Sequence, residues 1–415
     1  MAPRGTGVAF GDGGTSEATL QHHTTMRTSL RITALAALLL GANACDNETI
    51  FVGDRPGAPE DLLAEYAWVF EGFTTSGQSV GHPAVDLTWF PPSDWDQEPF
   101  RVYGKRSGGS GFFLIATVTS CTENGCTYRD RNVAPGTTYE YYVATVNEDT
   151  DEETTSDTRE VILVPATNIP AAPRLETPVA LDSAVFLRWT DPSNGANVGR
   201  YRVFLTRIDA RSDYLYPVGE SDGNGYLDLN ADNGHTYGYR LAAVDTLGRV
   251  SSLSAEVTAI PRPDRTAELI YAHSSNAAQS GFRYNVTTGT AAVVSGTTAD
   301  AHWRLERDGT GWRIVPLNGT RIADAGRTTA LACGPGSGPE CVAATTAPAA
   351  GYSTTAVALN PESSYVLAFT VGGRTHYGVV RAQILGSDQQ NRSLMIFDWS
   401  FQMISGEPRL DRRAN

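Results

Sequence analysis

Two stretches of this chain, one beginning at residue 84 and the other at residue 184, follow the same order of residues. The first reads AVDLTWFPPSDWDQEPFRVY and the second reads AVFLRWTDPSNGANVGRYRVF. In each, apolar residues alternate up to a tryptophan, Trp89 or Trp189, and a proline-containing turn leads into a strand with RVY or RVF. Alternation is typical of a half-buried strand, and a recurring unit indicates copies of one domain. We therefore expect two similar β domains.

A second repeated segment follows each tryptophan. Residues 133–146 read VAPGTTYEYYVATV, and residues 229–244 read LNADNGHTYGYRLAAV, with Tyr139 and Tyr237 at matching places. Together with the tryptophans, these segments resemble the fibronectin type III family, a seven-stranded immunoglobulin-like sandwich. The resemblance implies that both tryptophans fill the sandwich cores. It also implies that both tyrosines follow the turn between the fifth and sixth strands, E and F.

The expected fold class is all-β, with two tandem fibronectin type III sandwiches at residues 56–165 and 168–262 and a separate antiparallel β domain at 264–410. The last region consists of short alternating segments separated by Gly, Asn, Asp and Thr, which is typical of strands and turns. Residues 321–353 are rich in Gly, Ala, Pro and Thr, and we interpret them as a long insertion.

The first 44 residues are expected to be a signal region, with the true start possible at Met26. After two arginines a short apolar run ends in LLLGANAC, which is typical of a secretory signal peptide and too short to span a bilayer. The run also resembles a bacterial lipobox with Ala42 in place of the usual leucine, which implies lipidation at Cys45. Ordinary cleavage, giving a secreted or periplasmic protein, is the alternative. Residues 45–55 are polar and are interpreted as a tether.

Cysteine spacing supports the lipidated form. Of the five cysteines, four form two close pairs, Cys121 with Cys126 and Cys333 with Cys341, each bracketing turn-forming residues. An exported protein meets an oxidising compartment, so we expect two local disulfides. Cys45 then remains for the lipid, and the membrane is an expected partner. The predicted location is the cell envelope, at the outer membrane or cell surface.

The order of segments in the C-terminal region is similar to that of the HmuY-like family of bacterial surface haem-binding lipoproteins. The matching text is FRYNVTTG, ADAHWRLE, SYVLAFTVGGRTHYGVVRAQIL and IFDWSFQ. The resemblance implies haem as a cofactor, but the histidines of that family cannot be placed here by motif. His302 and His376 are the candidates, and an ordinary packed or exposed histidine is the alternative for each.

Charge and motifs argue against other classes. The formal net charge is −14, which argues against nucleic-acid binding because a phosphate backbone favours a basic surface. Without a catalytic motif we expect no enzyme. Glu306 and Asp398 are the carboxylate pair that keeps a glycosidase hypothesis open. The acidic residues of 147–160 are interpreted as a solvated hairpin tip, with a calcium site as the alternative.

Three functions therefore remain open. In the first, the two sandwiches are a spacer for a C-terminal domain that binds haem or another small molecule outside the cytoplasm. In the second, the protein is a structural or adhesive envelope protein that binds through the sandwiches. In the third, it acts on polysaccharide and the sandwiches are accessory. The ligand itself is unknown in all three.

Overall fold

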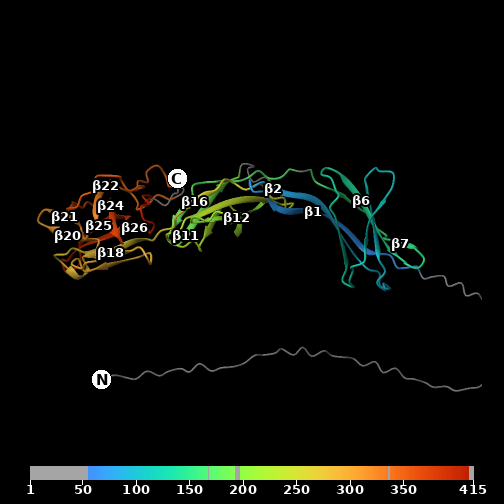
Figure 1. Ribbon diagram of the computed structural model, residues 1–415, viewed down its shortest axis with the longest axis horizontal. Helices are drawn as coiled ribbons and strands as arrows, with labels where there is room; N and C mark the ends of the chain where they lie inside the picture. Colours follow the sequence, from blue (N-terminus) through green and yellow to red (C-terminus); the bar gives the residue numbers. More distant parts are fainter. Residues whose placement is uncertain (1–54, 167, 192–196, 335–336, 411–415) are drawn as a thin grey trace, which may run out of the picture. The chain divides into compact units, whose positions relative to one another are not determined.

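The structure is a computed structural model that describes residues 55–166, 168–191, 197–334 and 337–410 (Figure 1). The signal region and Cys45 lie outside the described residues. The described residues form strands and loops with one short 3-10 helix, η1 (Ala277–Gln279). Within these ranges no helix has the length and hydrophobicity to cross a membrane. The protein is therefore all-β, as the sequence predicts.

The first sandwich packs a three-stranded sheet against a larger one. The smaller sheet has the order β1-β2-β5, with β1 (Glu60–Phe73), β2 (Ser79–Phe90) and β5 (Cys126–Asp130). The larger sheet has the order β4-β3-β6-β7, with β8 also paired to β6: β3 (Phe100–Arg106), β4 (Phe113–Val118), β6 (Thr138–Val146), β7 (Glu153–Thr155) and β8 (Glu160–Leu163). This is a fibronectin type III-like arrangement, in which β4 and β5 are edge strands of opposite sheets.

The second sandwich repeats this order. One sheet contains β10-β11-β14, with β9 also paired to β11: β9 (Arg174–Leu175), β10 (Val179–Leu181), β11 (Ala184–Thr190) and β14 (Gly225–Asp228). The other has the order β13-β12-β15-β16: β12 (Val198–Ile208), β13 (Tyr216–Ser221), β15 (Tyr237–Asp245) and β16 (Val257–Ala259). Trp89 and Trp189 are both buried between the sheets of their own sandwich, where the alternation places them.

The turn that leads into β6 of the first sandwich has the same hydrogen bond as the turn that leads into β15 of the second. The hydroxyl oxygen of Tyr139 accepts a hydrogen bond from the backbone N–H of Ala134 at 2.9 Å, and Tyr237 accepts from Asp232 at 2.9 Å. Three residues before each tyrosine the backbone turns with positive φ, at +70° in Gly136. A buried ring with its hydroxyl tied to backbone is the tyrosine corner of such sandwiches.

The C-terminal domain is a separate sandwich of two five-stranded antiparallel sheets. One has the order β17-β26-β25-β24-β22: β17 (Asp264–Tyr271), β22 (Arg321–Arg327), β24 (Ser363–Val371), β25 (Arg374–Ser387) and β26 (Ser393–Phe401). The other has the order β19-β18-β20-β21-β23: β18 (Gly281–Asn285), β19 (Thr290–Val294), β20 (Trp303–Asp308), β21 (Gly311–Pro316) and β23 (Val357–Ala358). Its core is rich in aromatic residues, with Phe282 in contact with Trp303 and Phe397.

The expected insertion at 321–353 is partly wrong, because residues 321–327 form strand β22. This segment reads RIADAGR, whose small residues have weak strand propensity, and pairing with β24 decides its conformation. The loop that follows packs onto the outer face of the β22-β24-β25 sheet. There Leu331, Ala344 and Ala347 contact Val366 and Val379 in a small second core.

Candidate functional site

The two candidate histidines lie within the C-terminal core. His302 is 9 % exposed, and its ring centroid lies 4.6 Å from that of Phe369. His376 is also buried, and its ring stacks on Phe369 at 5.9 Å. Both histidines therefore contact one phenylalanine ring. This is the placement of packed core histidines, the alternative that the sequence left open.

Their hydrogen bonds support the same conclusion. The backbone N–H of Tyr284 donates to Nδ1 of His302 at 3.1 Å, and Nδ1 of His376 lies 3.2 Å from the carbonyl oxygen of Gln402. Burial lowers the pKa of His302 to about 4, and burial also lowers the pKa of His376. Burial thus favours the neutral form of each ring, and one nitrogen of each is already engaged by backbone.

The carboxylate pair considered for catalysis is divided between sheets. Glu306 lies on β20, where Arg304 forms an ion pair with it at 2.5 Å. Asp398 lies on β26 of the other sheet and accepts hydrogen bonds from Gln383 and from the backbone N–H of Ala267. Each carboxylate is therefore engaged in its own local network, and this arrangement does not support a facing acid–base pair.

The acidic stretch at 147–160 forms the expected hairpin tip. Arg101 donates to Glu153 at 2.6 Å and to Asp151 at 2.7 Å, so two of the carboxylates are paired with one guanidinium. Tyr103 also donates to Glu153 at 2.7 Å. No group of metal-ligating side chains suited to an ion is found within the described ranges. Arg101 therefore pairs with two carboxylates of this stretch.

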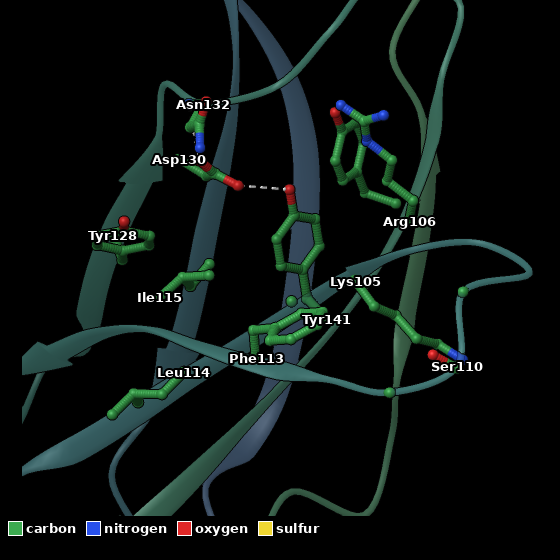
Figure 2. Close-up of a pocket in the computed structure, with 14 residues that line it drawn as sticks. Lys105, Arg106, Ser110, Phe113, Leu114, Ile115, Tyr128, Asp130, Asn132 and Tyr141 are labelled. Carbon is green, nitrogen blue, oxygen red and sulfur yellow. Dashed lines mark hydrogen bonds between the residues drawn. The ribbon is translucent and has the colours of Figure 1, made fainter.

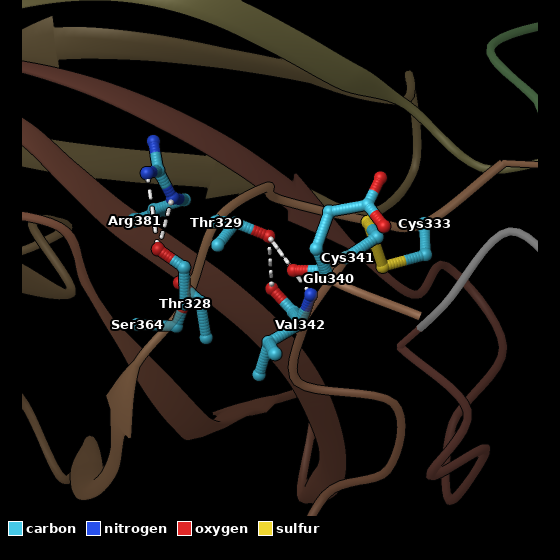
Figure 3. Close-up of a disulfide and its surroundings, with 8 residues drawn as sticks. All are labelled: Thr328, Thr329, Cys333, Glu340, Cys341, Val342, Ser364 and Arg381. Carbon is cyan, nitrogen blue, oxygen red and sulfur yellow. Dashed lines mark hydrogen bonds between the residues drawn. A yellow bond between two sulfur atoms is a disulfide. The ribbon is translucent and has the colours of Figure 1, made fainter. Parts of the chain in front are cut away.

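Both expected disulfides are present. Cys121–Cys126 closes the turn at the start of β5 in the first sandwich. Cys333–Cys341 closes the loop over the C-terminal sandwich (Figure 3). Beside it, Thr329 and Val342 exchange hydrogen bonds, and the guanidinium of Arg381 donates to the carbonyl of Thr328 at 3.1 Å. The second disulfide therefore closes a loop that is also hydrogen-bonded to Arg381 on β25.

A cleft of about 680 Å³ opens in the first sandwich, where edge strand β4 of one sheet faces edge strand β5 of the other (Figure 2). We call it the edge cleft. Its wall on β4 consists of Phe113, Leu114 and Ile115, and the end of β3 and the glycine-rich loop after it form the rim. Its other lining residues include Gly104, Arg106, Ser110, Tyr128, Asp130, Asn132, Tyr139 and Tyr141.

The floor of the edge cleft is part of the fold. The hydroxyl of Tyr141 donates to the buried carboxylate of Asp130 at 2.9 Å (Figure 2). The second sandwich has the same pair, because Tyr239 donates to Asp228 at 2.8 Å. Burial and the neighbouring carboxylate raise the pKa of both tyrosines. A pair that recurs in both sandwiches is structural and does not by itself mark a ligand site.

The equivalent space in the second sandwich is closed by a tyrosine. Strand registers place Tyr226 where the first sandwich has Tyr128. The hydroxyl of Tyr226 donates to the carbonyl of Val218 on β13 at 2.7 Å, so its side chain bridges the two edge strands. Among the described residues, the Tyr128 hydroxyl makes no such hydrogen bond. Tyr226 therefore closes the space between the edge strands of the second sandwich, whereas Tyr128 leaves the corresponding space of the first sandwich open.

Two positions explain this difference. In the second sandwich the ring of Tyr226 lies against Gly219, where a Cβ would overlap it. The same register position in the first sandwich is Ala116, whose Cβ excludes that ring position. Conversely, Leu205 of the second sandwich corresponds to Gly104 of the first. A Cβ at Gly104 would come within 2.9 Å of the Tyr141 ring, so a glycine keeps this space clear.

The wall and the rim of the edge cleft carry side chains that are exposed or without a partner among the described residues. Phe113 is 70 % exposed and Leu114 is 51 % exposed. Within the described part of the chain, the guanidinium of Arg106 forms no ion pair or hydrogen bond. In contrast, Lys105 is paired with Glu140 at 3.0 Å. The cleft thus presents an apolar wall and one available cation.

Sequence reasoning did not find the edge cleft. A local signal does exist, because Gly104 lies within strand β3, and a glycine in a strand often marks a close approach of a ligand or of other backbone. The glycine-rich loop 107–111 follows directly. What sequence could not show is that Gly104 lies against the Tyr141 ring on the neighbouring strand, and that Ala116 takes the position that Gly219 has in the second sandwich.

Comparisons with known proteins give weak similarities to fibronectin domains. No protein-family model and no curated protein sequence matches the chain. Domains FN1–FN3 of chicken CNTN1 match at 17% identity and TM-score 0.37, covering 50% of this chain and 68% of that one. The fibronectin(III)-like modules of Clostridium thermocellum CbhA match at 16% identity and TM-score 0.28, covering 48% and 94%.

A two-domain fibronectin type III segment from chicken tenascin is similar at 16% identity and TM-score 0.18, covering 49% of this chain and 97% of that one. Superpositions this weak carry no functional argument. The description of the two N-terminal sandwiches as fibronectin type III-like rests on their own strand order and tyrosine corners.

Proposed function

We propose that this chain is an exported cell-envelope protein that binds a ligand in the edge cleft of its first sandwich, with the other two sandwiches as supporting modules. The observation that carries the proposal is the contrast between two copies of one fold. The first copy leaves the gap between its edge strands open, whereas the second closes it with Tyr226. Concave sites of about 300–1,000 Å³ are typical of small-molecule binding.

Export is supported by the two disulfides, because such bonds persist in oxidising compartments. Lipid anchoring at Cys45 remains our proposal from the sequence, with secretion as the alternative. This arrangement corresponds to the second of the three functions considered above, binding through the sandwiches. Haem binding by the C-terminal domain gains no support from the packed positions of His302 and His376.

A fragment screen by crystallography tests the proposal without knowledge of the ligand. Crystals of the full chain would be soaked with a library of small polar and aromatic fragments. We expect fragments to gather in the edge cleft, against Phe113 and Arg106, and not at the sealed equivalent around Tyr226. Fragments that bind other surfaces but leave the edge cleft empty would contradict the proposed ligand-binding function. The second sandwich serves as the control within the same molecule.

A further inference from the structure

One charged side chain that lines the edge cleft has an apolar counterpart in the second sandwich. The strand registers pair Arg106 with Tyr139 and, in the second sandwich, Ile208 with Tyr237. The open copy therefore carries an arginine where the sealed copy carries an isoleucine. Because the Arg106 guanidinium has no partner among the described residues, its donors are available to a bound group. An arginine fork favours carboxylate, which it can bind through two parallel hydrogen bonds.

The remaining lining suits a polar, hydroxylated ligand. The Tyr128 hydroxyl and the side chains of Asn132 and Ser110 line the cleft and form no hydrogen bonds within the described residues. Phe113 presents an exposed aromatic ring beside them. The negative face of an aromatic ring attracts polarised C–H groups, such as those on one face of a sugar ring. The Phe113 ring can therefore pack against one face of a sugar, and the neighbouring polar side chains can hydrogen-bond its hydroxyl groups.

The edge strand is poorly suited to the other extended ligand, a peptide that adds to the sheet. Pairing of β4 with β3 shifts register between Val102 and Tyr103, which marks an irregularity in the ladder. Such irregularities twist an edge and interrupt the addition of a further strand. This favours a ligand held by side chains in the cleft over one held by strand pairing.

We propose that the edge cleft binds an acidic oligosaccharide containing uronate residues, with the carboxylate on Arg106 and a sugar face on Phe113. This inference rests on the proposed function and names its ligand class. Tyr128, Asn132 and Ser110 then hydrogen-bond the hydroxyls. The second sandwich has Tyr226 in this space and Ile208 in place of Arg106, so one uronate site is expected from each chain's fibronectin type III-like pair.

Isothermal titration calorimetry on the full chain tests the ligand class. The probes are trigalacturonate and a hyaluronan tetrasaccharide, with neutral cellotriose and with triglutamate as comparisons. We expect at least one uronate probe to bind and both comparisons to bind at least about tenfold more weakly, consistent with a charge-assisted bidentate pair and a sugar platform. Arg106→Gln and Phe113→Ala should each weaken that binding by about tenfold or more.

Tyr216→Ala is the matched control, because Tyr216 pairs with Leu205 as Phe113 pairs with Gly104 and is likewise exposed. It should leave binding unchanged. No binding of either uronate probe, equal binding of cellotriose, or an unchanged affinity in Arg106→Gln would each overturn the inference. Triglutamate binding as tightly would indicate a peptide ligand instead. In those cases, fragments bound in the cleft would still support the proposed function. A cleft without fragments would contradict both the proposed function and the uronate inference.

Discussion

Tyr365 and Asn360 form a third tyrosine corner, in the C-terminal sandwich. The backbone N–H of Asn360 donates to the Tyr365 hydroxyl at 2.8 Å, and the spacing of five residues equals that at Tyr139 and Tyr237. The position three residues before the tyrosine again has positive φ, here +57° in Glu362. All three sandwiches therefore fix the start of a core strand in the same way.

Tyr365→Phe should destabilise the C-terminal sandwich by about 0.5–1.5 kcal/mol, because it removes the partly buried hydrogen bond between the Asn360 N–H and the Tyr365 hydroxyl. Urea unfolding followed by hydrogen exchange in peptides from 264–410 measures the change. Tyr352→Phe is the control: its hydroxyl is buried without a hydrogen-bond partner among the described residues, so its removal should cost little. Equal effects of both substitutions would contradict the role of the corner.

The C-terminal sandwich should lose stability as the pH falls from about 6.5 towards about 4. Burial lowers the pKa of His302 to about 4, so between these values the unfolded chain binds a proton that the folded chain does not. Each pKa unit is worth about 1.4 kcal/mol, which makes the full loss on the order of 3 kcal/mol. Denaturant unfolding at several pH values, followed as for Tyr365→Phe, measures it.

His302→Gln provides the control for this pH dependence. Glutamine does not titrate, so the variant should show a smaller fall in stability across the same pH window. The carboxylates of the domain titrate in both proteins and cancel in the comparison. Identical slopes for the two proteins would show that His302 is not held neutral by burial.

The two disulfides should form within their own domains. A non-reducing peptide map is expected to show Cys121 with Cys126 and Cys333 with Cys341, without crossed pairs. Replacing Cys333 and Cys341 by serine should cost at most about 2–3 kcal/mol in the chain-entropy model, because the closed loop is short. Hydrogen exchange should then rise around Thr329 and Val342. Free thiols or crossed pairs in exported protein would refute this assignment.

Cys45→Ser should move the protein from the membrane fraction to the soluble fraction, because it removes the expected lipid attachment. Fractionation of cells followed by immunoblotting measures the shift. The double variant Cys121→Ser/Cys126→Ser is the control and should stay with the membrane. A mature protein whose N-terminal Cys45 is unmodified by mass spectrometry would rule out the anchor.

Trp89→Ala should cost the first sandwich about 3–5 kcal/mol, the usual range for emptying a large aromatic site. That is a large part of a domain's total stability of roughly 5–15 kcal/mol. Hydrogen exchange resolved by domain should show the loss in the first sandwich and not in the second. Trp189→Ala should give the reverse pattern. A uniform loss across the chain in either variant would argue against independent cores.

The two N-terminal sandwiches were predictable because their determinants are local. Trp89 ends an alternating run, and Tyr139 follows a Pro-Gly turn, so each of these two features can be recognised within a short sequence segment. The third corner was missed because its text, LNPESSY, has Glu362 at the positive-φ position where the other copies have glycine. That conformation is uncommon without glycine, and tertiary packing imposes it here.

The edge cleft could not be predicted in the same way. It depends on Gly104 lying against Tyr141, which is distant in the chain, on Ala116 at the position that Gly219 has in the second sandwich, and on the register of the strand pairs. A glycine, an alanine or a tyrosine at one strand position also occurs in sandwiches without a cleft, so none of them predicts one by itself. Likewise, the alternating run around His376 predicted a strand but not that its ring would lie on Phe369.

The hydrogen bond from Tyr226 to Val218 has a consequence for valency. Under the proposed function, a chain whose second sandwich is closed has one such site in this pair of modules, so each chain would hold a repetitive polymer through a single contact. Firm attachment would then require several chains side by side, whose clefts raise one another's effective concentration. The ring of Tyr226 would thus make avidity a property of many chains together rather than of the single molecule.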